Sequence, residues 1–242
     1  MLWRCLKAEA QKCRRAPVWL AFLVLPLFPA ILGTGNYLAN LAALENGWYS
    51  LWSQHTLFSS LFFLPALLGV FCAWQWRLEH SGHNWNGFLT APVPVGTLYA
   101  AKLILAAGMS LLAQGIVGGL FLLSGKLAGL PGPPPAELPG WLLCGALGGA
   151  AVCGVQLLLS LAIRAFAPPV ALGLAGGILG LLLTAQGAGY AFPYSLLCLG
   201  MRANNPQMVL SLPPFVCAAL LWTALCAALT LRLLRRRDAA TE

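Results

Sequence analysis

Residues 76–102 read WRLEHSGHNWNGFLTAPVPVGTLYAAK and separate two long apolar runs of the chain. Polar residues gather in this segment, whereas the chain as a whole is 60% hydrophobic and only 8% charged. Soluble domains carry about a quarter charged residues. The composition therefore predicts a polytopic membrane protein in which this segment is the main polar connection on one side.

Six apolar runs are long enough for the about 20 residues that a membrane-spanning helix needs. Because the backbone must satisfy its own hydrogen bonds in lipid, and because the alternating segments of a barrel do not occur, the runs are predicted to be helices. The predicted fold class is an all-α membrane protein, with residues 1–242 forming one domain and its six transmembrane helices within 17–231. The predicted spans are Pro17–Tyr37, His55–Trp76, Leu103–Leu123, Leu138–Ile163, Pro169–Tyr190 and Met208–Leu231.

Basic residues decide the predicted orientation of the spans. With the N-terminus in the cytoplasm, twelve of the 14 Lys and Arg residues fall inside, and only Lys126 and Arg202 fall outside. Cytoplasmic loops of membrane proteins carry this excess of positive charge. Both termini are therefore predicted to be cytoplasmic, with 232–242 as a basic tail. The net charge of +8 is attributed to topology and attraction to anionic lipid, not to nucleic acid.

The first sixteen residues are basic but also contain apolar side chains. This pattern favours an interfacial helix over residues 1–16 that runs along the membrane before the first span, with a plain basic flank as the alternative. Its candidate interfacial residues are Trp3, Lys7, Lys12, Arg14 and Arg15.

The uncharged stretch from Ala165 to Met201 is too long for one span. Gly187, Gly189 and Pro193 are expected to break it. Residues Tyr190–Asn205 are therefore predicted to fold back into the outer leaflet as one or two short re-entrant helices.

Two further features concern packing and the outer surface. The fourth span is rich in Gly and Ala, which lets neighbouring helices approach closely. Trp48, Tyr49 and Trp52 are predicted to lie in an outer loop, where they serve either as anchors in the interfacial aromatic belt or as contacts for a substrate.

Motifs of catalysis and nucleotide binding are missing from the sequence. It contains no P-loop and no G-x-S-x-G elbow, and Glu79, His80 and His83 follow an order that differs from both zinc-protease motifs. No Asp, Glu, Lys or Arg lies in the six predicted spans, whereas ion-coupled transporters keep polar groups there. No catalytic, metal or cofactor site is therefore expected, and movement of a cargo would need an energy source outside this chain.

The segment 76–102 contains a short amphipathic pattern. Trp85, Phe88 and Leu89 have the spacing of one helix face, and Pro92 follows where the helix would stop. The residues alone leave two interpretations open, which are a simple interfacial helix and a docking helix for a cytoplasmic ATPase.

Several blocks of the sequence resemble a known family. Glu79, Trp85, Leu89, Pro92, Val93 and Lys102 follow the pattern E…W…L…P-V…K, which resembles the inner-loop signature of ABC-2 type exporter permeases. More narrowly, GWYSLWSQHTLF at 47–58 and WRLEHSGHNWN at 76–86 are similar to the permease subunits of lantibiotic immunity ABC transporters. The start LKAEAQKCRRAPVWL at 6–20 agrees with that group.

The resemblance implies a permease subunit of an ATP-driven exporter in the bacterial cytoplasmic membrane. ATP and Mg would bind to a separate ATPase present in two copies, and a second related permease or a second copy of this chain would complete the transporter. The implied cargo is a lantibiotic, which is a cationic antimicrobial peptide, and another drug or lipid-like cargo is the alternative. The many Ala, Gly and Pro residues depart from that group and leave the particular peptide open. The implied ATPase-coupling residues are Arg77, Glu79, His80, His83, Trp85, Phe88, Leu89, Pro92 and Lys102.

Overall fold

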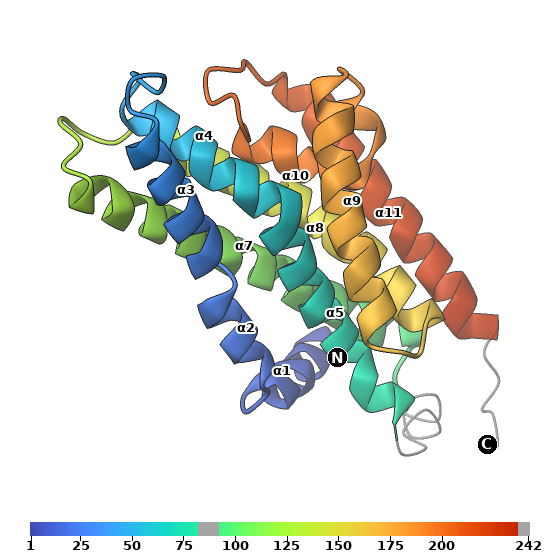
Figure 1. The fold of residues 1–242 in the computed structure, drawn as a ribbon. Coiled ribbons are helices and arrows are strands. Elements are labelled where there is room, and N and C mark those ends of the chain that lie inside the picture. The colour runs from blue at the N-terminus through green and yellow to red at the C-terminus, as the bar shows by residue number, and fades with distance from the viewer. Residues whose placement is uncertain (82–91, 237–242) are drawn as a thin grey trace.

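A computed structural model describes residues 1–81 and 92–236, and in these residues the chain folds as helices without strands (Figure 1). Six segments are long and apolar enough to cross a membrane, which confirms the predicted fold class of a multi-pass membrane protein. These segments are Val18–Ala39, Trp48–His80, Val95–Leu127, Leu138–Ala162, Ala167–Ala185 and Leu212–Arg236.

Some spans are single helices and others are interrupted. The first span consists of two helices, and the second consists of two helices joined by a π-helical turn. The α-helices are α1 (Leu2–Cys13), α2 (Val18–Val24), α3 (Leu27–Ala39), α4 (Trp48–Phe58), α5 (Leu64–His80), α7 (Val95–Leu127), α8 (Leu138–Ala162), α9 (Ala167–Ala185), α10 (Pro193–Met201) and α11 (Leu212–Arg236).

The first helix lies across one end of the bundle, where α5 and α11 also end (Figure 1). Cys5, Glu9 and Cys13 form its buried face, whereas Trp3 and Lys7 are exposed. The helix itself is thus present, and its position at a membrane surface stays a prediction. We call this the basic end because it carries Arg4, Lys7, Lys12, Arg14, Arg15, Arg77, Lys102, Arg164, Arg232, Arg235 and Arg236.

The interruption of the first span lies at Pro26. This residue lacks an N–H group and its ring clashes with the preceding turn, so α2 ends at Val24 and α3 begins at Leu27. The ring of Phe28, in the first turn of α3, stacks on that of Phe63 at a centroid distance of 5.6 Å. The break in the first span therefore packs against the irregular part of the second span.

The π-helical turn of the second span covers Ser59–Phe63 and precedes Pro65. The proline cannot donate to the carbonyl of Leu61, and its ring crowds that carbonyl, so the helix widens by one residue before it. Two glycines of α9 accept this bulge. A Cβ atom at Gly177 would collide with the Leu61 carbonyl, and one at Gly173 would lie 3.0 Å from the Pro65 carbonyl.

Helices α3 and α4 are joined by neutral polar contacts. The backbone of α4 passes so close to Gly33 that a Cβ atom there would lie 2.8 Å from the amide nitrogen of His55. Thr34 Oγ1 lies 2.9 Å from His55 Nε2, and Asn36 Nδ2 donates to Gln54 Oε1 at 2.6 Å. Because the Thr34 hydroxyl donates to Ala30 O, we assign the proton of this pair to His55 Nε2.

Small residues let α8 touch α10 backbone to backbone, as the composition of the fourth span predicted. A Cβ atom at Gly148 would collide with the carbonyl of Leu196, and one at Gly200 with the carbonyl of Cys144. The short helix α10 lies in the segment predicted to fold back, together with a 3-10 turn at Gly189–Ala191. Its depth in a membrane stays a prediction.

Candidate functional site

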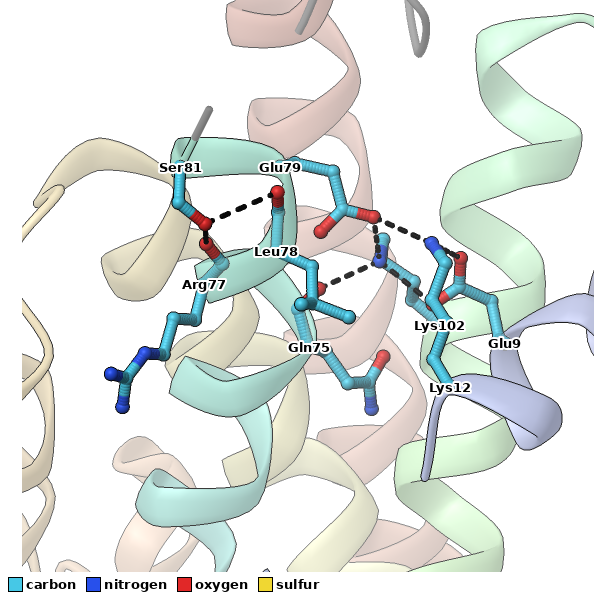
Figure 2. A network of polar contacts seen from close by, with 8 residues as sticks. All are labelled: Glu9, Lys12, Gln75, Arg77, Leu78, Glu79, Ser81 and Lys102. Atoms are coloured by element: carbon cyan, nitrogen blue, oxygen red, sulfur yellow. Dashed lines mark hydrogen bonds and ion pairs between the residues drawn. The ribbon is translucent and has the colours of Figure 1, made fainter. Parts of the chain in front are cut away.

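Four charged side chains from three helices meet at the basic end (Figure 2). Glu9 and Lys12 come from α1, Glu79 from the last turn of α5, and Lys102 from the beginning of α7. We call these four residues the ion cluster. It connects both helices that flank the segment 81–94 to the N-terminal helix.

Lys102 is the centre of the ion cluster. Its side chain is fully buried, and Nζ lies 4.9 Å from the ring centroid of Trp76. The ammonium group donates to Glu9 Oε2, to Glu79 Oε1 and to the backbone carbonyl of Gln75, each at 2.8 Å. These three acceptors match the three N–H donors of a lysine, so the buried cation is fully hydrogen-bonded.

Lys12 completes the ion cluster from its rim. It donates to Glu9 Oε1 at 2.6 Å and to Glu79 Oε1 at 2.8 Å. Glu9 therefore uses both oxygens, whereas Glu79 Oε1 accepts two bonds and Glu79 Oε2 has no partner among the described residues. Two ammonium groups balance two carboxylates, which offsets the large cost of burying isolated charges.

The pKa of Lys12 reflects this position. Burial by itself lowers the pKa of a lysine, but the carboxylates of Glu79 and Glu9 outweigh it, so the pKa is raised above its ordinary value of 10.5. Lys12 is therefore held in its charged form at neutral pH.

Helical spacing explains why these residues point inward. On α1, Glu9 lies four residues after Cys5 and four before Cys13, which places all three on one face. On α7, Lys102 lies between the buried residues Tyr99 and Ala106 on one face. Glu9 was not among the predicted site residues, and its only sequence signal is an acid on the apolar face of a basic helix, three residues before a lysine.

The boundaries of two spans correct the prediction. Helix α5 continues to His80 rather than ending at Trp76, and α7 begins at Val95 rather than Leu103. Glu79 and Lys102 therefore lie within long helices rather than in the connection between them. Their pairing offsets the cost of burying the two charges.

The other predicted coupling residues lie apart from the ion cluster. Arg77 is exposed. Its guanidinium carbon Cζ lies 5.7 Å from the ring centroid of Trp74 and 5.8 Å from that of Phe166. His80 Nε2 donates to the carbonyl of Ser160 in α8 at 2.9 Å, and Pro92 is exposed. Four further predicted coupling residues lie outside the described part of the chain, namely His83, Trp85, Phe88 and Leu89.

The predicted interfacial residues of α1 are all exposed, namely Trp3, Lys7, Lys12, Arg14 and Arg15. Lys12 has in addition a role that the sequence pattern did not predict, because its bonds to Glu9 and Glu79 attach it to the ion cluster. It lies three residues after Glu9, so the two side chains occupy adjacent positions of one helix face. The location of these residues at a membrane surface stays a prediction.

The three outer aromatic residues were predicted in a loop, but they form the first turns of α4. Trp52 is fully buried and its Nε1 donates to the carbonyl of Met201 at 2.9 Å. Trp48 is buried against Gly125. Neither indole is available to a substrate, because the rings pack between helices and not toward lipid, and only Tyr49 remains partly exposed.

The ion pairs of the ion cluster join the end of α5 and the beginning of α7 to α1. Among residues 1–81 and 92–236, no group of three or more His, Cys, Asp or Glu side chains is arranged to hold a metal ion.

Comparison with known proteins identifies the family. The sequence profile described as ABC-2 family transporter protein matches residues 5–180, which contain the whole ion cluster and most of the spans. A search of curated proteins gave no match. Proteins of this family are membrane permeases of ABC exporters, which associate with an ABC ATPase and typically with a second permease. From the profile match, which covers well over half of its length, we conclude that the chain belongs to the ABC-2 family of transporter proteins.

Proposed function

We propose that this permease exports a lantibiotic, a cationic and amphipathic antimicrobial peptide, and so protects the cell from it. The similarity of residues 47–58 and 76–86 to lantibiotic immunity permeases supports this cargo. The permease pairs with a second related permease or with another copy of itself, and two copies of an ATPase bind ATP and Mg on the cytoplasmic side.

The coupling route runs through the segment between α5 and α7. In this proposal Trp85, Phe88 and Leu89 form the face that contacts the ATPase. When ATP closes the ATPase dimer, that contact moves the ends of α5 and α7. A partner shifts the equilibrium between two conformations of the permease only if it binds one of them better than the other. The two helix ends must therefore respond to the partner together.

The ion cluster is the observation that carries this proposal. Lys102 on α7 binds Glu79 on α5 at 2.8 Å, and both are bound to α1 through Glu9 and Lys12. Helices that share a buried, balanced set of charges resist separation, because moving one of them apart leaves an unpaired buried charge on the others. A push on the connecting segment is therefore expected to move α1, α5 and α7 as one unit.

The test is reconstitution of the permease with its ATPase in lipid nanodiscs. ATP hydrolysis and peptide release are measured with a lantibiotic and, separately, with a neutral lipophilic drug. Stimulation by the lantibiotic alone supports the proposed cargo, and stimulation by the drug alone favours the alternative cargo.

A matched pair of tryptophan variants tests the coupling route. Trp85→Ala is expected to insert normally but to lose co-purification of the ATPase. Trp3→Ala removes an indole that is 75% exposed at the same end and is expected to retain it. Normal co-purification and full export in Trp85→Ala refute the coupling role.

A further inference from the structure

A groove of about 780 Å³ lies at the end of the molecule opposite the basic end. It is bounded by the first turns of α4 and α8 and by the loop that connects α10 to α11. Tyr49, Glu137, Gly140, Trp141, Arg202 and Met208 are among its lining residues. Its volume falls within the range of about 300–1,000 Å³ that is typical of small-molecule sites.

The groove carries one charge of each sign, and the two do not pair. Arg202 is 9% exposed, and its guanidinium donates to the carbonyls of Leu199 and Gly200, both at 3.0 Å. These neutral acceptors leave the positive charge unbalanced. The Glu137 carboxylate is exposed and is oriented by the Tyr49 hydroxyl, which donates to Oε2 at 3.2 Å. Neither Arg202 nor Glu137 forms an ion pair within residues 1–81 and 92–236.

Three of the candidate spans begin beside the groove, at Trp48, Leu138 and Leu212. A groove at the ends of spans is expected at the level where a membrane meets water. The buried ring of Trp141 supports the Tyr49 ring at a centroid distance of 5.9 Å. Part of the rim is apolar, with Val209 93% and Leu212 52% exposed. Such a rim suits the acyl chains that follow a head group.

We propose that this groove binds the zwitterionic head group of a membrane phospholipid, with its ammonium at Glu137 and its phosphate at Arg202. A guanidinium is well suited to phosphate, and a carboxylate to a primary ammonium. A purely cationic ligand would satisfy Glu137 but would repel Arg202, and a purely anionic one would do the reverse. A head group that carries both charges can pair with Glu137 and with Arg202. This assignment does not depend on the exported cargo.

Native mass spectrometry of the detergent-purified chain tests the site with three lipids of matched acyl chains. Phosphatidylethanolamine is expected to bind about tenfold more tightly than phosphatidylcholine or phosphatidylglycerol. The quaternary ammonium of phosphatidylcholine has no N–H group to donate to Glu137. Phosphatidylglycerol has no ammonium group.

Charge variants test the contributions of Glu137 and Arg202 separately. Glu137→Gln is expected to remove the preference for phosphatidylethanolamine, and Arg202→Gln to weaken binding of all three lipids. Glu45→Gln and Lys126→Gln remove exposed charges at the same end outside the groove and are expected to change nothing.

A steric variant keeps the test valid if Arg202→Gln misfolds. A Cβ atom at Gly140 meets no other atom within 4 Å, so Gly140→Leu is expected to occupy part of the groove without displacing the backbone. It is expected to abolish the preference for phosphatidylethanolamine. Gly119→Leu, at an equally open position on α7, is the control.

Three outcomes overturn the proposal. The first is equal binding of the three lipids by the unmodified chain. The second is an undiminished preference for phosphatidylethanolamine in Gly140→Leu. The third is binding of a lysine-rich peptide in the groove, blocked by Gly140→Leu, with no binding of phosphatidylethanolamine.

Discussion

The two ends of this permease treat charge in opposite ways. At the basic end, Lys102 is fully buried and shares its hydrogen bonds with Glu9 and Glu79. At the other end, Glu137 and Arg202 face the same groove without pairing, and aromatic packing around Trp52 holds the helices together.

This difference suggests that the two ends have different tasks. A closed set of paired charges has little left to offer a ligand and acts as a link between helices. An open pair of opposite charges costs stability and is available for binding. The proposed connection to the ATPase thus lies at the end with paired charges, and the proposed lipid site at the end with unpaired ones.

The most severe test of the comparison is Lys102→Gln. This change leaves two buried carboxylates with one ammonium group, and a broken buried pair costs about 3–5 kcal/mol. We expect a much lower melting temperature in detergent. The double variant Glu9→Gln/Lys102→Gln keeps Lys12 and Glu79 as a balanced pair and is expected to recover part of the loss. A double variant that is less stable than Lys102→Gln would argue against charge balance as the basis of the link.

Trp52 provides the corresponding test at the end opposite the basic end, which we call the aromatic end because Trp52, Phe121 and Trp141 pack there. Trp52→Ala empties a buried site between Phe121 and Trp141 and is expected to lower stability by about 3 kcal/mol. Trp52→Phe keeps a ring and loses only the bond from Nε1 to Met201, which is expected to cost about 1 kcal/mol. Thermal unfolding measures both. Equal losses would show that the hydrogen bond, and not the packing, holds this end.

A smaller change at the aromatic end is Gly125→Ala. The ring of Trp48 lies directly on Gly125, so a methyl group there displaces the indole and is expected to cost about 2 kcal/mol. Gly119→Ala, on the same helix with no atom near its Cβ position, is expected to be neutral or slightly stabilising. The two melting temperatures are compared, and equal values would mean that the aromatic packing tolerates this shift.

The smallest expected effect is that of Lys12→Gln at the rim of the ion cluster. The Lys12 side chain is 36% exposed, so solvent screens its ion pairs and the expected loss is about 1 kcal/mol. Because the pKa of Lys12 is raised in the folded protein, this contribution is complete below its ordinary pKa of 10.5 and is lost as the pH rises through the raised pKa.

Melting temperatures of Lys12→Gln and the unmodified chain are therefore expected to differ at neutral pH and to converge as the pH rises through the raised pKa of Lys12, which lies above 10.5. Lys7→Gln, on the exposed face of the same helix, is the control. A difference that persists unchanged at high pH would mean that Lys12 acts through packing and not through its charge.

The sequence predicted the six spans because length and hydropathy alone define them. It also predicted the short helix near Pro193, since an uncharged stretch too long for one span has to fold back. The ion cluster could not be predicted in the same way. Glu79 and Lys102 are 23 positions apart, and their burial depends on contacts between helices rather than on local pattern.

The prediction for the outer aromatic residues failed because it expected exposed side chains that are in fact buried. Interfacial tryptophans commonly face lipid, which made Trp48 and Trp52 candidates for an exposed loop. Their burial depends on Gly125 and on the Met201 carbonyl, which lie far away in the chain. Local composition could not indicate which side of the helix packs against the rest of the protein.

The π-helical turn at Ser59–Phe63 has a consequence for the opposite end of the same span. A turn with one extra residue rotates everything after it by about 100° relative to an uninterrupted α-helix. Glu79 lies more than four turns after this bulge in the same span. The bulge thus sets the direction in which the Glu79 side chain leaves the helix axis. Deleting one residue there and replacing Pro65 by leucine would allow a regular helix that is equally apolar, but it would turn the carboxylate away from Lys102. The phase of a helix, as much as its hydrophobicity, determines whether this membrane protein assembles.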